Sequence, residues 1–524
     1  MKGMISAPQP LAVDAGAKVL AAGGNAVDAA VTAAFVQMVL TPRSCGIGGF
    51  GMMNIHCGAT RGEIVLDFHG KAGAKVKPEM WVNEIVRENP SGYGYALKGQ
   101  VNDRGYKAVT TPGTVAGLYA AQTEYGTMPW RQVVQPGIEV AAGGFEVDDA
   151  TARAWSAKPI GAESSPWVSC GRSAYEGGGE FVANPDMART FSIIAEGGAE
   201  VFYRGDLARQ IAADMERGGG FVTLDDLNGY EVTRTRPLYS SYRGFGLASN
   251  QPPGGGVTIL QMLKILEGYD LAALGHLSPE YIYTVSMAMK AAWADRAQLV
   301  GDPAFVEVPL ADLLSEERAA QWRRRIDGGE KIAIPRWQAQ EPPSTTHLSV
   351  VDSGGNVVGL THSLGSGADV VTQGLGFMYN NCMNCFNPLV GQSNSIEPGK
   401  SRLTGMGPTL VKVDEKPYFS VGAPGGTRIV TGILHAILNV IDQGMSATEA
   451  IAAPRFDCQD DVIVAHARIA PSVCEKVRAL GHDINRTLSS YGGIASVHGI
   501  LIDPATGELD GGADPGDSGM ALEV

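Results

Sequence analysis

Residues 345–364 constrain the fold of this chain most, because their pattern predicts a β-hairpin. Residues 345–352 alternate and are rich in β-branched side chains, which is typical of a strand. The turn residues Ser353-Gly354-Gly355-Asn356 come next, and residues 357–364 are the expected returning strand. The sequence therefore predicts two paired antiparallel strands in this region.

The register of this hairpin would bring several hydroxyl groups together. If the register is symmetric about the turn, Thr345 lies opposite Ser363 and His347 lies opposite Thr361. Side chains alternate with a period of two, so Thr361 and Ser363 would share one face next to Thr345. Their hydroxyls either hydrogen-bond Thr345 or are ordinary strand hydroxyls bonded to nearby backbone. His347 and His362 are expected to be core histidines with hydrogen-bond partners.

Thr345 has a chemical role only if the chain is cut between Ser344 and Thr345. The new α-amino group would then belong to the same residue as the hydroxyl, and an unperturbed α-amino group has a pKa of about 8. A threonine with its own terminal amine is a recognised form of activated nucleophile. Without other evidence, the default interpretation is that Thr345-Thr346-His347 begins an ordinary strand.

A second candidate element is the Pro424-Gly425-Gly426 turn, which follows an expected strand. Two consecutive glycines allow backbone N–H groups to approach a substrate with no Cβ in the way. Such donors can stabilise the oxyanion of a tetrahedral intermediate, and each is typically worth about 2.7–4 kcal/mol. The alternative is a simple turn before an apolar helix over residues 429–441.

Composition limits the class of protein. By length alone, 524 residues would suggest three or four domains, and 44% apolar residues supply an ample core. The net charge of −14 argues against binding to nucleic acid or to anionic membranes. The seven cysteines are scattered, which does not indicate a disulfide framework.

No targeting or membrane-spanning segment is evident. The first eight residues lack the apolar core of a signal peptide. Residues 26–40 are the most apolar stretch, but they contain Asp28 and are too short to span a bilayer. This stretch is expected to be a buried helix with Asn25 as its N-cap. We therefore expect a cytoplasmic protein.

These pieces, together with other motifs, resemble the γ-glutamyltransferase (glutathione hydrolase) family of N-terminal-nucleophile hydrolases. The resemblance covers nearly the whole chain. The matching motifs, in chain order, are Pro10-Leu11-Ala12, Gly23-Gly24-Asn25-Ala26-Val27-Asp28-Ala29-Ala30, Gly46-Ile47-Gly48-Gly49-Phe50, Thr111-Pro112-Gly113-Thr114, Tyr125-Gly126-Thr127-Met128-Pro129, Asp295-Arg296, Gly301-Asp302-Pro303, the Thr345 hairpin, Asn380-Asn381, Met406-Gly407-Pro408-Thr409, the Pro-Gly-Gly turn and Ala453-Pro454-Arg455-Phe456.

The resemblance implies an α+β fold, an αββα four-layer sandwich of two antiparallel sheets with helices outside. It implies a proenzyme that cleaves itself at Ser344–Thr345 into a large subunit (1–344) and a small catalytic subunit (345–524), which stay together as one compact domain. The Thr345 hydroxyl would attack an amide carbonyl, with Gly425 and Gly426 as the oxyanion donors. Thr361 and Ser363 match positions that support the nucleophile. Family members need no metal or organic cofactor.

The chain departs from the family where the γ-glutamyl group is bound. The arginine that binds the substrate α-carboxylate is His69 here, and neutral histidine offers neither a permanent charge nor a bidentate fork. The acidic and amide groups that recognise the α-amino group are replaced by Cys382 and Cys385. Where the family has a pair of serines, this chain has Thr404-Gly405, and where the family has an asparagine after the hairpin, this chain has Gly365.

Cys382 and Cys385 form a C-x-x-C pair, for which we considered three interpretations. No second pair at zinc spacing accompanies them, so a metal site is not expected. We favour small pocket-lining residues over a disulfide that changes the pocket. Arg43, Arg402 and Arg428 are candidates for a new carboxylate anchor, which the sequence alone does not place.

The sequence therefore predicts a self-processing threonine amidohydrolase or acyltransferase that cleaves a small amide other than glutathione. Relatives that act on oxamate or on acylated β-lactam side chains give a precedent for such a change of substrate. One alternative is a true γ-glutamyl transpeptidase in glutathione metabolism; another is an unprocessed homologue that binds a ligand without catalysis. The expected partners are the substrate and the two subunits of one precursor, with a homo-oligomer as a further option.

Overall fold

The predicted hairpin lies in the middle of a large sheet. In the computed structural model, which describes residues 2–60, 62–88, 95–147, 181–334, 344–488 and 490–524, β11 (Thr345–Val351) pairs antiparallel with β12 (Val357–Ser363). Thr345 lies opposite Ser363 and His347 opposite Thr361. The predicted register is confirmed. The expected proline-rich tail before Ser344 falls in residues 335–343, outside the described residues.

The described residues form two large sheets, and every strand pair within them is antiparallel. The first sheet has the order β20 (Met520–Glu523), β1 (Met4–Ala7), β11, β12, β2 (Phe50–Cys57), β3 (Gly62–Phe68) and β8 (Thr233–Thr235). The second has the order β19 (Leu509–Ala513), β18 (His498–Ile502), β14 (Lys416–Gly422), β13 (Thr409–Val413), β10 (Phe245–Ser249) and β9 (Leu238–Tyr242).

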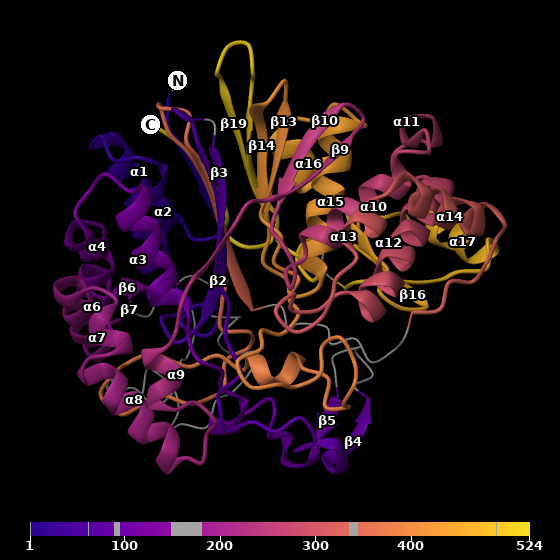
Figure 1. Ribbon diagram of the computed structural model, residues 1–524. Helices are drawn as coiled ribbons and strands as arrows, with labels where there is room; N and C mark the ends of the chain where they lie inside the picture. Colours follow the sequence, from indigo (N-terminus) through magenta and orange to yellow (C-terminus); the bar gives the residue numbers. More distant parts are fainter. Residues whose placement is uncertain (1, 61, 89–94, 148–180, 335–343, 489) are drawn as a thin grey trace.

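Helices cover the outer face of each sheet, as Figure 1 shows. On the side of the first sheet lie α1 (Pro10–Ala21), α2 (Ala26–Leu40), α3 (Thr114–Tyr125), α4 (Trp130–Gly143), α6 (Pro185–Gly197), α7 (Glu200–Tyr203), α8 (Asp206–Arg217) and α9 (Leu224–Asn228). On the side of the second lie α10 (Gly256–Leu266), α11 (Leu271–Leu274), α12 (Pro279–Leu299), α13 (Leu310–Leu313), α14 (Glu316–Asp327), α15 (Arg428–Ile441), α16 (Ala447–Ala452) and α17 (Pro471–Ala479). The expected αββα sandwich is confirmed.

Smaller elements complete the described fold. They are the pairs β4 (Ile85–Glu88) with β5 (Tyr95–Leu97) and β6 (Phe145–Glu146) with β7 (Phe181–Val182), the three-stranded sheet of β15 (Phe456–Asp457), β16 (Val462–Ala465) and β17 (Asp483–Arg486), and the 3₁₀ turn Cys382–Cys385. None of the helices in the described part of the chain is both long and apolar enough to cross a bilayer.

α2 shows how the local sequence sets an element that supports the site. It begins after Asn25, whose side chain accepts hydrogen bonds from the N–H groups of Val27 and Asp28 at 3.0 Å. Every residue of α2 is buried, because the helix contacts β11 and β12 on one side and α1 and α4 on the other. Both the predicted N-cap and the predicted helix are confirmed. The C-terminal end of α2 therefore lies close to Thr345.

A polar layer lies between the two sheets behind the site. His347 on β11 contacts the Thr361 hydroxyl at 2.9 Å and the Ser349 hydroxyl at 3.1 Å. Ser420 on β14 donates to Ser349 across the sheets at 3.2 Å. His362 points the other way and contacts Gln37 of α2 at 2.9 Å. Both histidines are buried, so their predicted role as hydrogen-bonded core residues is confirmed.

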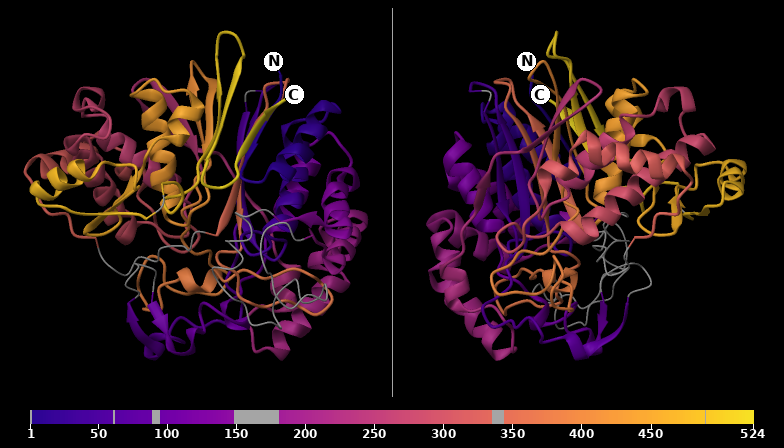
Figure 2. Two further views of the ribbon diagram at one scale, coloured as in Figure 1. Left: turned by 180° about the vertical axis from the view of Figure 1, so that it is seen from behind. Right: turned by 45° about the vertical axis from the view of Figure 1, so that its right-hand side comes forward.

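Each large sheet contains strands from both sides of Ser344. In the first sheet β1, β2 and β3 come from residues 1–344, whereas β11, β12 and β20 come from residues 345–524. The N- and C-termini lie together at one end of the sheets (Figure 2), where β1 pairs with β20. Because β1 and β11 run antiparallel, Thr345 lies at the opposite end.

Candidate active site

Thr345 is the first residue of β11, and its hydroxyl faces Ser363 on the neighbouring strand. The two oxygens are 2.9 Å apart, and Thr345 keeps 8% of its surface exposed. Ser363 is the last residue of β12 and is buried. Their proximity follows from the hairpin register, because directly opposite residues in an antiparallel pair have close side chains.

Ser363 also contacts the peptide bond in front of Thr345. Its hydroxyl donates to the Ser344 carbonyl oxygen at 2.7 Å and accepts from the N–H of Gly365 at 2.8 Å. A hydroxyl has only one hydrogen to donate, so Thr345 must be the donor in the Thr345–Ser363 contact. The arrangement holds the Thr345 oxygen beside the Ser344–Thr345 bond and gives its proton an acceptor.

Thr361 lies two residue pairs further along the hairpin and contacts His347 rather than Thr345. Burial holds the pKa of His347 well below its ordinary value, with smaller contributions from His498 and His362. The imidazole is therefore neutral at physiological pH and exchanges hydrogen bonds with hydroxyl groups. The structure thus brings Ser363 to the nucleophile and places Thr361 in the polar layer behind it.

The Pro424-Gly425-Gly426 turn follows β14 and reaches the same end of the sandwich. Gly425 has φ 141° and Gly426 has φ 65°, values that favour glycine. A Cβ on Gly425 would lie 2.6 Å from the Cα of Ala495, so no side chain fits there. Gly425 lines the same pocket as Thr345, which places bare backbone next to the candidate nucleophile.

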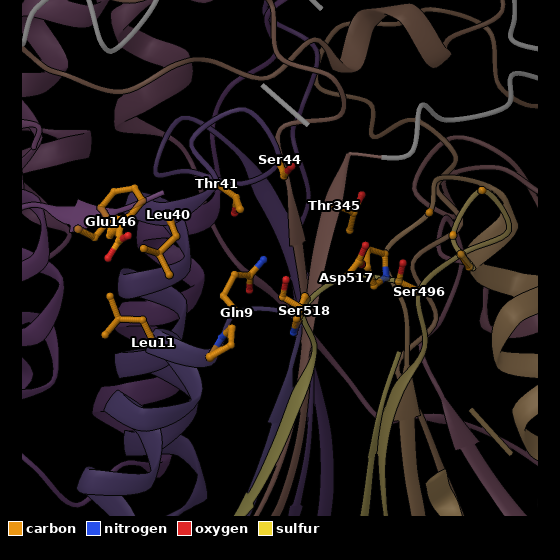
Figure 3. Close-up of a pocket in the computed structure, with 18 residues that line it drawn as sticks. Gln9, Leu11, Leu40, Thr41, Ser44, Glu146, Thr345, Ser496, Asp517 and Ser518 are labelled. Atoms are coloured by element: carbon orange, nitrogen blue, oxygen red, sulfur yellow. The ribbon is translucent and has the colours of Figure 1, made fainter. Parts of the chain in front are cut away.

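The pocket at Thr345 has a volume of about 440 Å³. Figure 3 shows Gln9, Leu11, Leu40 and Thr41 on one side of it and Ser496 and Asp517 on the other. The Gln9 oxygen accepts a hydrogen bond from Gln37 at 2.7 Å, which connects the pocket wall to α2. Thr345 and Gly425 together form part of the pocket lining, so a bound amide would meet both groups.

Sequence reasoning missed most of this lining. Gln9, Glu146 and Asp517 come from three distant parts of the chain, and no local pattern singles them out. A weak signal was available in the Pro10-Leu11-Ala12 motif, because Pro10 and Leu11 line the pocket.

His69 lies outside this pocket, in a buried cluster at the end of the β2–β3 pair where β2 begins and β3 ends. The His69 ring is 5.0 Å from the Phe50 ring, and the Arg402 guanidinium is 4.7 Å from the Phe50 ring. Neither ring nitrogen of His69 has a hydrogen-bond partner. Burial holds the pKa of His69 well below its ordinary value, and the charges of Arg402 and Lys71 act in the same direction.

Arg402 is the one of three candidate anchors that lies beside His69. It is fully buried and donates to the Leu403 carbonyl at 2.7 Å. Arg428 donates to the Gly493 carbonyl and lies 3.4 Å from an oxygen of Asp457, so its charge is already engaged. The pKa of Arg43 is lowered by burial despite the opposing charge of Asp369.

The remaining predicted binding residues are all buried. Cys382 is buried in the core, and Cys385 donates to the Asn384 side chain at 3.0 Å. Neither cysteine is among the described residues that line the Thr345 pocket, and the six described cysteines form no disulfide. The Thr404 carbonyl accepts a hydrogen bond from Arg296 at 2.7 Å.

At Gly365 and Gly405, neighbouring atoms approach the backbone so closely that a side chain would not fit. Gly365 has φ 74°, and a Cβ there would clash with the Asn381 side chain. A Cβ on Gly405 would clash with the Gly426 carbonyl oxygen, so Gly405 packs directly against the candidate oxyanion turn. Within the described residues, no cluster of three or more His, Cys, Asp or Glu side chains has the geometry to hold a metal ion.

Comparison with known proteins gives consistent matches. Residues 12–524 match the family described as Gamma-glutamyltranspeptidase. A glutathione hydrolase proenzyme from Pseudomonas sp. (strain A14) is 35% identical, covering 94% of this chain and 86% of the relative. The acylase ACY 1 proenzyme from Pseudomonas sp. (strain V22) is 34% identical, covering 97% and 93%.

A solved structure is similar over almost its whole length. The cephalosporin acylase from Bacillus halodurans superposes with a TM-score of 0.88 at 28% identity, covering 99% of this chain and 95% of that one.

Proposed function

Because this chain belongs to the gamma-glutamyltranspeptidase family and has its N-terminal-nucleophile hydrolase fold, we propose that it cleaves itself at Ser344–Thr345 and then hydrolyses an amide other than glutathione through an acyl-enzyme on Thr345. The protein is an enzyme of this family. What we propose is the identity of its substrate and the position at which the chain is cut.

The contact of Ser363 with both reacting groups supports the proposal most directly. The Ser363 oxygen lies 2.9 Å from the Thr345 hydroxyl and 2.7 Å from the Ser344 carbonyl oxygen. A hydroxyl that accepts the nucleophile's proton while donating to the carbonyl assists attack on that carbonyl. A strand that used Thr345 only for packing would not require this arrangement.

Self-cleavage would proceed in two balanced steps. The Thr345 oxygen attacks the Ser344 carbonyl carbon, the hydroxyl proton is transferred to the Thr345 nitrogen, the bond between that carbon and that nitrogen breaks, and an ester replaces the peptide. Water then hydrolyses the ester, which leaves a Ser344 carboxylate and a Thr345 α-amino group. The subunits 1–344 and 345–524 would remain associated, because strands from both are paired with one another in each large sheet.

The same groups would then act on an external amide. The Thr345 amine, with an ordinary pKa of about 8, accepts the hydroxyl proton as the oxygen attacks the substrate carbonyl. The amide groups of the Gly425-Gly426 turn are the proposed donors to the oxyanion. The amine half of the substrate leaves with the proton that the Thr345 α-amino group had accepted. Water then hydrolyses the ester on Thr345 and releases the acid.

The acyl group is proposed to carry a negative charge but no obligatory α-amino group. His69 is neutral, and Cys382 and Cys385 supply no carboxylate for an ammonium. Arg402 lies on the inter-sheet face next to His69. Thr345 pairs with Ser363 and Ser363 with Phe50, so two strand spacings, roughly 10 Å, separate the backbone of Thr345 from that of Phe50, whose ring lies under Arg402.

A dicarboxylic acyl group fits these groups better than γ-glutamyl. Glutaryl is γ-glutamyl without the α-amino group, so the two p-nitroanilides form a matched pair. We expect glutaryl-p-nitroanilide to be hydrolysed with at least about tenfold higher kcat/KM, because an ammonium left without its partners in a buried site is costly.

Measuring both substrates with wild type and Thr345→Ala tests the proposal. Faster turnover of the γ-glutamyl compound would instead support a glutathione hydrolase, the activity named for the relative at 35% identity. Turnover that survives Thr345→Ala would exclude Thr345 as the nucleophile.

A further inference from the structure

We propose that the pocket beside Thr345 binds the amine half of the substrate, and that it selects amines without a negative charge. This half is the leaving group in hydrolysis and the acceptor when the acyl group is transferred. The proposal rests on the proposed function, because it takes Thr345 as the nucleophile.

The order of strands separates the two halves of a bound amide. On one side of β11 lie β12 and β2, which lead to Phe50 and to Arg402. On the other side lie β1 and β20. Gln9 follows β1 and Asp517 precedes β20, and both line the pocket.

An amide whose carbonyl carbon sits at Thr345 therefore extends in opposite directions. If its acyl half points toward Arg402, its amine half points into the pocket. Gly425 lines the pocket together with Thr345, so the reacting carbonyl would lie at the boundary between the two halves.

The charges of the lining select against anions. Glu146 and Asp517 are the charged side chains among the described lining residues, and both are acidic. Asp517 accepts a hydrogen bond from Ser496, while burial raises its pKa. Ionised carboxyl groups at these two positions would repel a carboxylate placed in the pocket, and because burial raises the pKa of Asp517, this repulsion is tested on the alkaline side of neutrality.

The rest of the lining fits a small amphipathic group. Leu11, Leu40 and Phe145 provide an apolar wall, and Thr41, Ser44 and Ser496 provide hydroxyls. A volume of about 440 Å³ lies in the range of small-molecule sites. A small amine that is neutral or positively charged could contact the apolar side chains and hydrogen-bond the hydroxyls.

Glutathione fails this requirement independently of its acyl half. Its amine half is cysteinylglycine, which ends in a carboxylate. Repulsion from Glu146 and Asp517 would oppose this group even if the γ-glutamyl half were accepted. The pocket therefore adds a second reason, separate from His69, for a substrate other than glutathione.

The test compares two dipeptides that differ only in this charge. Alanylglycinamide and alanylglycine have the same size, and the amide lacks the terminal carboxylate. Their dissociation constants for the purified wild-type protein are measured at pH 8 by ligand-observed NMR. We expect the amide to bind about fivefold more tightly, as expected for partly exposed charge pairs.

Charge variants connect this preference to the pocket. In Glu146→Gln/Asp517→Asn the preference should fall to within about twofold. Glu216→Gln, which removes one exposed carboxylate on α8, is the matched control and should keep the wild-type preference.

The proposal is overturned if the two dipeptides bind equally, if alanylglycine binds more tightly, if neither binds at millimolar concentrations, or if the double variant retains the preference. The pocket is present in the uncleaved chain, so binding can be measured whether or not self-cleavage occurs. An intact mass that shows no cleavage would count against the proposed function alone.

Discussion

Thr345 and Ser363 face each other across the first residue pair of the β11–β12 hairpin, with their hydroxyl oxygens 2.9 Å apart. The same Ser363 oxygen is 2.7 Å from the Ser344 carbonyl oxygen. One side chain therefore connects the candidate nucleophile to the bond that self-cleavage would break. This relationship is the structural basis of the self-cleavage that we propose.

Thr345→Ala should abolish both self-cleavage and amide hydrolysis, because it removes the attacking oxygen. The intact mass of the wild type should show two fragments that meet at Ser344–Thr345, and the variant should remain one chain near 54.9 kDa. Thr345→Ser is the matched control and should still be cleaved. A single chain in the wild type would exclude self-cleavage under the conditions used.

Ser363→Ala should slow self-cleavage by about 10²-fold, because a hydrogen bond to a reacting group of roughly 2–3 kcal/mol is lost. Thr361→Val should instead reduce the free energy of unfolding by about 1–3 kcal/mol, because the buried His347 loses a partner, and should leave the cleavage rate nearly unchanged. The rate is followed by mass spectrometry and stability by urea denaturation. Equal effects of the two variants on the rate would contradict these separate roles.

His69→Arg would restore the family residue, but the structure predicts a cost. The new guanidinium would lie beside the buried Arg402, and repulsion between two buried cations lowers the free energy of unfolding, an effect that Asp67, 3.9 Å from a ring nitrogen of His69, offsets only in part. We expect γ-glutamyl-p-nitroanilide turnover to rise most in His69→Arg/Arg402→Leu, where the repulsion between the two guanidinium groups is removed. A single variant as stable as the wild type would show that the cluster tolerates a second charge.

Gly425→Ala should eliminate activity, because the added Cβ would lie 2.6 Å from the Ala495 Cα and the φ of 141° disfavours alanine. Thermal denaturation and turnover are measured together. Gly143→Ala, in the last turn of α4 where a Cβ would meet nothing within 4 Å, is the control and should leave both unchanged. Full activity in Gly425→Ala would exclude this turn as the oxyanion site.

Acid should destabilise the protein between pH 6.5 and about pH 4. Burial lowers the pKa of His362 to about 3 and of His498 to about 4. The unfolded chain therefore binds these protons first, near pH 6.5, and stability present above that pH is lost as pH falls.

Asp67 has the opposite effect on the pH dependence of stability. Burial raises its folded pKa to about 7, so its contribution to the free energy of unfolding increases as pH falls. The histidines outnumber it, so we expect a net loss of stability on acidification. Urea unfolding at half-unit pH steps measures the sum, and unchanged stability from pH 7 to 4.5 would contradict the prediction.

Local patterns predicted the elements that form the site. The symmetric turn at residues 353–356 fixed the register that pairs Thr345 with Ser363. Asn25 and the apolar run after it correctly gave the bounds of α2. These predictions succeeded because strand alternation and helix capping act over a few residues.

By itself, the sequence determined the hairpin, the buried helix, the Gly-Gly turn and the family to which they belong. Only the tertiary structure decided that Thr361 contacts His347, that Arg402 lies beside His69, and that Gln9 and Asp517 line one pocket with Thr345. Gln9 and Asp517 are separated by nearly the whole chain and meet because β1 and β20 pair at the edge of the first sheet. Contacts of that kind depend on how sheets and helices pack, and neither periodicity nor turn chemistry carries that information.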